Sequence, residues 1–210
     1  MSTATYRARR TSRATVRRRR LAGLVTLLGL GSIALGVAGL AGVGPLADPV
    51  RQITLPLRHE DIIRQQAADK GVDAALIAAV IYHESKFRDQ TSDAGARGLM
   101  QITPETADYI AAKSGGTAFE QGDLATPQIN IAYGAWYLDY LQQKYDDRDL
   151  AAVAAYNAGE GNVDGWIGEA GGLDNFSEAH IAFPETREYV DGVLDKRAEY
   201  RKHYADDLGY

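Results

Sequence analysis

The chain carries no charged side chain from Leu21 to Ala47, a run of 27 residues rich in leucine, alanine, valine and glycine. A helix needs about 20 apolar residues to cross the hydrocarbon core of a bilayer, so this run is long enough. Residues 1–20 hold eight arginines and no acidic residue, which places that end in the cytoplasm. The run therefore predicts a transmembrane signal-anchor over residues 21–47, a basic cytoplasmic tail over residues 1–20, and an extracytoplasmic remainder.

A cleaved signal peptide is the alternative interpretation of the same run. Small residues such as Gly39 and Ala41 would suit a signal peptidase, and glycine is frequent throughout. Both interpretations put the remainder outside the cytoplasm, membrane-held in the first case and secreted in the second.

The charge and residue types of the remainder exclude several classes of function. The chain has a net charge of −5, and subtracting the +8 of residues 1–20 leaves −13 for residues 21–210. Such an acidic body argues against nucleic acid as a partner, because phosphate binding needs a basic face. There is no cysteine, and the four histidines lie far apart in the sequence, so no metal site and no cofactor is predicted.

After a short linker over residues 48–57, which contains Pro49 and Pro56, the pattern of residues 58–210 predicts one all-α domain. Threonine–proline pairs and aspartates are typical of helix starts, and glycine of helix ends. Runs of alternating β-branched residues are absent, apart from a small irregular or β element expected around residues 88–102. The expected helices are residues 59–70, 74–83, from Pro104, 127–145, 150–156 capped by Asp149, and 184–203, with glycine-rich loops at 95–98, 115–116, 159–165 and 171–172.

Glu84 follows an apolar stretch at the end of one predicted helix. Partial burial there would raise the pKa of its carboxyl group and make it a proton donor near neutral pH. A glutamate on the surface of a helix end is the alternative on this feature alone. The pair His83-Glu84 does not continue into a zinc-protease motif, because position 87 holds Phe87 where the second histidine would be required.

Two further segments carry polar groups beside glycines. The first segment is Gly-Ala-Arg-Gly-Leu-Met-Gln at residues 95–101. Its glycines let the backbone approach a ligand closely, and the amide of Gln101 offers a hydrogen-bond donor and an acceptor. Residues 154–159, Ala-Ala-Tyr-Asn-Ala-Gly, place Tyr156 and Asn157 at a helix end. Each segment alone is as consistent with a structural turn or cap as with a binding site.

Four motifs in a fixed order change this interpretation: Glu-Ser-x-Phe at 84–87, Gly-Leu-Met-Gln at 98–101, Ala-Tyr-Asn-Ala-Gly at 155–159 and Glu-Thr-Arg-x-Tyr-Val at 185–190. Together they closely resemble the soluble lytic transglycosylase (SLT) domain of glycoside hydrolase family 23, which is related to goose-type lysozyme. Asn130, Gly134 and Tyr137 add to the match, which covers roughly residues 60–205. The resemblance implies a lysozyme-like all-α fold with a groove for peptidoglycan strands.

The resemblance also implies roles for individual residues. Glu84 matches the family's catalytic acid and base, while Ser85 matches a structural serine. The matched substrate-binding positions are Ser92, Gln101, Tyr156, Asn157, Glu185 and Tyr189, with Tyr189 placed to hydrogen-bond the catalytic carboxylate. Two departures are visible: Thr103 stands where relatives often have methionine, and residues 165–183, with Phe176 and His180, form a longer link than usual.

With one motif carboxylate, the resemblance implies that Glu84 protonates the leaving oxygen and then deprotonates the muramyl 6-hydroxyl, which closes a 1,6-anhydro ring. The alternatives are a muramidase that uses water on the same fold, and an inactive glycan-binding scaffold. The implied partners are peptidoglycan strands and the membrane, and the resemblance leaves open partners among proteins of cell-wall synthesis or division.

Overall fold

The computed structural model describes residues 47–116 and 118–210. The contacts divide the chain at Thr54, so that Leu55–Tyr210 form one compact unit. Helix α2 spans Ala47–Thr54, where a linker over residues 48–57 was predicted. Within the described ranges no helix is both long and apolar enough to cross a membrane. The transmembrane segment predicted over residues 21–47 lies, apart from Ala47, outside the described residues.

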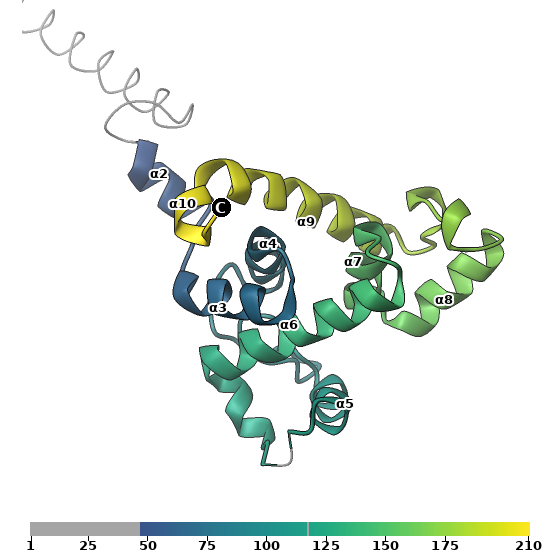
Figure 1. Ribbon diagram of the computed structural model, residues 1–210, viewed down its shortest axis with the longest axis horizontal. Coiled ribbons are helices and arrows are strands. Elements are labelled where there is room, and N and C mark those ends of the chain that lie inside the picture. Colours follow the sequence, from purple (N-terminus) through teal and green to yellow (C-terminus); the bar gives the residue numbers. More distant parts are fainter. Residues whose placement is uncertain (1–46, 117) are drawn as a thin grey trace, which may run out of the picture. The chain divides into compact units, whose positions relative to one another are not determined.

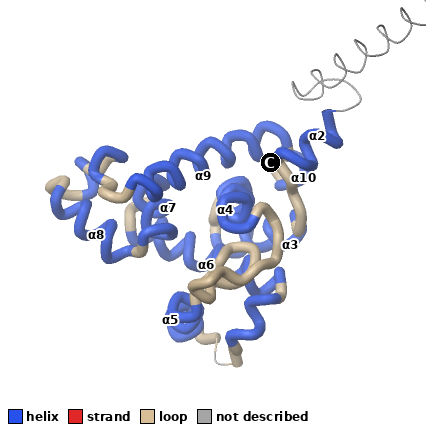
Figure 2. Tube along the Cα trace, turned by 180° about the vertical axis from the view of Figure 1, so that it is seen from behind, coloured by secondary structure: helices blue, strands red, loops and turns tan. Residues whose placement is uncertain are grey.

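The compact unit is built of helices, and the part of the chain that the structure describes contains no strand (Figure 2). The predicted all-α class is therefore confirmed. The helices are α3 Glu60–Lys70, α4 Ala74–Ser85, α5 Pro104–Ser114, α6 Pro127–Lys144, α7 Asp149–Ala158, α8 Glu160–Glu169, α9 Pro184–His203 and α10 Ala205–Leu208. Three short 3₁₀ turns join them: η1 Gln121–Ala125, η2 Leu173–Asn175 and η3 Glu178–His180.

Helix α4 forms the centre of this unit, with α3, α6 and α9 packed around it (Figure 1). All residues from Ala74 to Ile81 are buried, because the segment is apolar on every side. Each fully buried large aliphatic side chain contributes roughly 1.5–3 kcal/mol to folding. The predicted cap is present, since the Asp73 carboxylate accepts a hydrogen bond of 3.0 Å from the backbone N–H of Ala75. The last turn of α4 carries Glu84.

One predicted cap is wrong. Asp149 is the first residue inside α7 rather than its cap, and its carboxylate accepts hydrogen bonds from Gln142 and Arg197 instead. Arg197 on α9 also pairs with Asp73 at the start of α4. Burial alone would raise the pKa of Asp73, but its hydrogen bond from Tyr210 and the charge of Arg197 outweigh burial and lower that pKa. This ion network fixes α9 against α4 and α7.

The loop predicted over residues 159–165 is also wrong, because α8 begins at Glu160. Glycine inside a helix costs about 1 kcal/mol relative to alanine. Burial of Val163 and Trp166, three residues apart on one face, offsets that cost. The segment of residues 165–183 continues from α8 through η2 and η3. Its Phe176 is buried, so the segment packs on the domain.

The loop from residue 88 to 102 holds the small β element that was expected, as isolated bridges from Arg97 to Thr91 and to Ile102. Buried Asn130 on α6 holds this loop, accepting from Met100 N at 2.8 Å and donating to the carbonyl oxygens of Arg97 and Leu124 at 2.9 and 3.1 Å. Gly98 adopts a φ of +77°, and a Cβ there would lie 2.2 Å from the Asn130 amide nitrogen. The loop is thereby fixed beside the end of α4.

Candidate active site

Glu84 lies in the last turn of α4, with a half-buried side chain. Burial raises the pKa of its carboxyl group to about 7, although a hydrogen bond from Tyr189 acts in the opposite direction. At neutral pH, a carboxyl group with this pKa is protonated in a large fraction of the molecules. It can therefore both donate and accept a proton under those conditions.

Tyr189 reaches this carboxylate from α9, and its hydroxyl donates a hydrogen bond of 2.6 Å to Glu84 Oε1. The hydrogen bond expected from the sequence is thus present, and it joins two residues that lie 105 positions apart in the chain. Burial and the charge of Glu84 raise the pKa of Tyr189 well above its ordinary value, so the hydroxyl remains a donor. The Tyr189 ring meets the His83 ring edge-on at 5.8 Å. A Cβ on Gly192 would lie 2.4 Å from His83 Cε1, so this packing requires glycine.

Tyr156 on α7 lies beside the loop of residues 88–102, close to Gln101 in that loop. The Tyr156 hydroxyl donates to the carbonyl oxygen of Met100 at 2.9 Å, and burial, together with the charge of Glu84, raises the pKa of Tyr156 well above its ordinary value. Gln101 has a φ of +47° and donates from Nε2 to the carbonyl oxygens of Gly98 and Gln90. Both residues line a cavity of about 50 Å³, together with Ile102, Thr103, Thr106 and Tyr137.

Asn157, the residue after Tyr156 on α7, contacts the start of α9. The Thr186 hydroxyl donates a hydrogen bond of 2.7 Å to Asn157 Oδ1. Glu185, which the sequence indicated, has an exposed side chain, whereas its neighbour Thr186 is buried. Thr186 was missed in the sequence. The helical spacing of Thr186, Val190 and Val193, all buried on α9, was the signal that could have identified it.

Ser92 lies in an exposed part of the loop of residues 88–102, where its hydroxyl accepts a hydrogen bond of 3.1 Å from Ala96 N. That bond stabilises the loop's own turn. The connection from this loop to Glu84 is made by Gln90, whose Nε2 donates to the backbone carbonyl of Glu84 at 3.1 Å. Gln90 was not indicated by the sequence patterns.

The charges around Glu84 are few. Burial raises its pKa, the hydrogen bond from Tyr189 lowers it in part, and among residues 47–116 and 118–210 no carboxylate adds to the shift. Asp89 and Asp93 are exposed in the loop. Within these same ranges, no group of three histidine, aspartate or glutamate side chains is arranged to hold a metal ion. The arrangement is therefore one proton-transferring carboxyl group, supported by one tyrosine and flanked by polar side chains from α7, α9 and the loop.

Three comparisons point the same way. The family model of the transglycosylase SLT domain matches residues 61–178. The soluble lytic murein transglycosylase of Escherichia coli is 36% identical over 156 residues, which is 72% of this chain and 24% of that protein. The membrane-bound lytic murein transglycosylase F of Pseudomonas fluorescens is 34% identical over 135 residues, 61% of this chain and 26% of that protein. The chain thus spans about a quarter of the length of these relatives.

Solved structures give the same result for the fold. The 70-kDa soluble lytic transglycosylase of Escherichia coli superimposes with a TM-score of 0.69 at 29% sequence identity, covering 83% of this chain and 30% of that one. An inactive mutant of the lytic transglycosylase Slt from Pseudomonas aeruginosa gives a TM-score of 0.67 at 32% identity, over 74% of this chain and 26% of that one.

Proposed function

The chain belongs to the family of the transglycosylase SLT domain, and on this premise we propose that it is a lytic transglycosylase of peptidoglycan. The bond cleaved is the β-1,4 bond from N-acetylmuramic acid to N-acetylglucosamine, in cell-wall remodelling. The observation that carries the proposal is the half-buried Glu84 carboxyl group with a pKa near 7, hydrogen-bonded by Tyr189.

In the first step, Glu84 donates its proton to the glycosidic oxygen as the bond to the muramyl C1 breaks. The oxygen leaves as a hydroxyl group of the departing sugar, and Glu84 becomes a carboxylate. The muramyl C1 gains oxocarbenium character, which the substrate's own N-acetyl group stabilises. The Tyr189 hydroxyl donates to Glu84 Oε1 and stabilises the negative charge that forms there.

In the second step, the Glu84 carboxylate takes the proton of the muramyl 6-hydroxyl. The oxygen of that hydroxyl bonds to C1 and closes the 1,6-anhydro ring. Glu84 is again protonated and no water is consumed. The attacking hydroxyl belongs to the reacting sugar, so the step gains from proximity.

The surroundings of Glu84 support this route over hydrolysis. Inverting hydrolysis needs a second carboxylate ~6.5–9.5 Å away, and a retaining enzyme needs one at ~5–5.5 Å. Among the described residues, the pKa of Glu84 is set by burial and by the hydrogen bond from Tyr189, and the carboxylates of Asp89 and Asp93 in the nearby loop are exposed. We assign the binding of flanking sugars to the positions that match the substrate-binding residues of the family: Ser92, Gln101, Tyr156, Asn157, Glu185 and Tyr189.

A digest of purified peptidoglycan tests the reaction. We expect muropeptides that carry 1,6-anhydro ends, which are lighter by one water than reducing-end fragments and resist borohydride reduction. Mass spectrometry before and after borohydride treatment measures both properties. Products that are fully reducible by borohydride and heavier by one water would instead identify a muramidase. Peptidoglycan that remains uncleaved would indicate an inactive glycan-binding scaffold.

We further infer that residues 21–47 anchor this domain to the membrane, with residues 1–20 in the cytoplasm and residues 58–210 as the catalytic domain outside. The uncharged run supports this, as does a relative whose name describes it as membrane-bound. N-terminal sequencing of the membrane-extracted protein is expected to find a chain that retains residues 21–47. A mature chain that begins between about Gly39 and Asp48 would show a cleaved signal peptide.

A further inference from the structure

Aromatic rings from three helices form a continuous row that begins at Tyr156 on α7. Tyr156 contacts Tyr137 on α6 at a centroid distance of 5.7 Å, and Tyr137 stacks on Tyr140 at 6.1 Å. Tyr140 stacks on Trp136 at 5.7 Å with an angle of 2° between the ring planes. Tyr109 on α5 meets Tyr140 edge-on at 5.7 Å. The row therefore leads from α7 across α6 to α5.

The inner end of the row belongs to the candidate active site. Tyr156 and Tyr137 both line the small cavity beside Gln101. Burial, and after it the nearby charge of Glu84, raises the pKa of Tyr156. A sugar bound at Glu84 would thus lie beside the first ring of the row.

The outer end of the row reaches the surface. Tyr137 is 9% exposed, whereas Tyr109, Trp136 and Tyr140 are all partly exposed. Partly exposed, mutually stacked rings are typical of surfaces that bind a ligand with apolar faces and polar edges.

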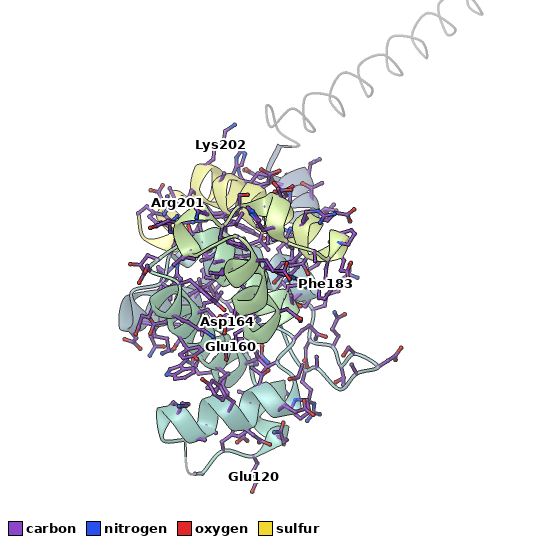
Figure 3. All side chains as sticks on the ribbon, turned by 90° about the vertical axis from the view of Figure 1, so that its right-hand side faces the viewer. Glu120, Glu160, Asp164, Phe183, Arg201 and Lys202 are labelled. Atoms are coloured by element: carbon purple, nitrogen blue, oxygen red, sulfur yellow. The ribbon has the colours of Figure 1, made fainter. Side chains whose placement is uncertain are left out.

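Polar groups border these outer rings. The Tyr140 hydroxyl donates to Glu160 Oε2 at 3.0 Å, and Lys144 Nζ donates to the same oxygen at 2.6 Å. The side chains of Lys144 and Glu160 are each 27% exposed. Figure 3 labels Glu160 and Asp164 near each other on α8, and Lys144 also pairs with Asp164 at 2.8 Å. A carboxylate and an ammonium group beside aromatic rings can hydrogen-bond sugar hydroxyl and acetamido groups.

We propose that Tyr109, Trp136 and Tyr140 form a distal sugar platform, which binds the glycan strand beyond the units held at Glu84. This proposal rests on the proposed function. The apolar C–H faces of pyranose rings pack on the partly exposed surfaces of these aromatic rings. The platform is pre-organised, because Trp136 is stacked on Tyr140 and Tyr140 is held by Glu160. Binding therefore costs little side-chain entropy.

The competing explanation is that these rings only pack α5 onto α6. The two explanations differ in their dependence on substrate length. A platform away from Glu84 affects long glycans and leaves short ones unchanged, whereas a packing defect affects both. Tyr133 supplies a matched control, because it lies on α6 three residues before Trp136 and contacts Phe119 instead of the row.

The test uses the full chain in the Glu84→Gln background, with the dimer and the hexamer of β-1,4-linked N-acetylglucosamine as probes. Calorimetry is expected to show that Trp136→Leu weakens hexamer binding about tenfold, in line with the energy of one aromatic contact. Dimer binding stays unchanged, Trp136→Phe restores most of the hexamer affinity, and Tyr133→Leu has no effect. Equal weakening of both oligomers, or of neither, would overturn the platform.

Fluorescence gives an independent measurement, because the chain has two tryptophans, Trp136 and Trp166. In Trp166→Phe, the hexamer but not the dimer is expected to change the emission of Trp136. An unchanged emission would refute the platform even if Trp136→Leu failed to fold. Length-dependent binding, together with a parent chain that retains Glu84 and cleaves no peptidoglycan, would overturn the proposed function alone. Cleavage together with length-independent binding would overturn the platform alone.

Discussion

Glu84→Gln is expected to lower the rate of glycan cleavage by at least about 10²–10⁴-fold, the usual contribution of a general acid or base. The loss should lie at the upper end, because the same carboxyl group serves in both steps. Glutamine keeps the shape of the side chain and still accepts the Tyr189 hydrogen bond, so binding of glycan is retained. Rates on purified peptidoglycan, measured as released muropeptides, check this expectation.

Glu188→Gln is the matched control, since Glu188 is an exposed carboxylate next to Tyr189 on α9. It makes the same change of charge and should leave the rate unchanged. A Glu84→Gln protein that kept most of the parent rate would show that another group transfers the proton.

The stability of Glu84→Gln provides a second test of the role of Glu84. The pKa of Glu84 is about 7 in the folded protein, above its ordinary value of 4.5. Between these values the folded state keeps a proton that the unfolded state has lost, so this carboxyl group lowers the stability as the pH rises from about 4.5 to about 7. Glutamine has no charge to bury. Glu84→Gln should therefore be more stable than the parent above pH 7, by roughly 1–3 kcal/mol in urea unfolding.

Tyr189→Phe is expected to lower the rate about tenfold or more, because a hydrogen bond to a charged group contributes roughly 1.5–3 kcal/mol. It should also move the pH dependence. The hydrogen bond from Tyr189 lowers the pKa of Glu84, so its removal raises that pKa further above 7. Glu84 must be protonated to start the reaction, and the fall of kcat/KM at alkaline pH should therefore move to higher pH.

Tyr156→Phe separates this effect from general damage to the site. The Tyr156 hydroxyl binds the Met100 carbonyl and not Glu84. Loss of the Tyr156 hydroxyl should reduce the rate without shifting the alkaline limb of the pH profile, the part in which kcat/KM falls as the pH rises. An alkaline limb that stays in place in Tyr189→Phe, or moves to lower pH, would contradict the assigned role of Tyr189. The measurement is kcat/KM against pH, which reports the pKa values of the free enzyme.

Local sequence signals determined much of the helical framework. Asp73, Thr103 and Pro184 mark helix starts, and Gly71 marks a helix end, because capping depends on residues within one turn of each other. The apolar stretch over residues 74–83, after the cap Asp73, predicted the helix that the structure shows as α4. The order of the four motifs identified the family and singled out Glu84. None of these inferences needed knowledge of contacts distant in sequence.

Patterns alone failed where distant residues set the outcome. The glycines of residues 159–165 predict a loop, yet burial of Val163 and Trp166 against the rest of the domain forms α8. Asp149 has the sequence character of a cap, but Arg197 on α9 recruits its carboxylate. In both cases a tertiary contact outweighs a local preference that amounts to about 1 kcal/mol.

The chemistry of the site was decided in the same way. The sequence names Glu84, but the surrounding helices bury it and α9 brings the Tyr189 hydroxyl to it, and these two contacts set its pKa. The buried partner of Asn157 is Thr186 and not its exposed neighbour Glu185, because the helical phase of α9 turns Thr186 inward. A residue's type is written in the sequence, whereas its desolvation and its hydrogen-bond partners depend on segments that only the folded chain brings together, 105 residues apart for Glu84 and Tyr189 and 29 for Asn157 and Thr186.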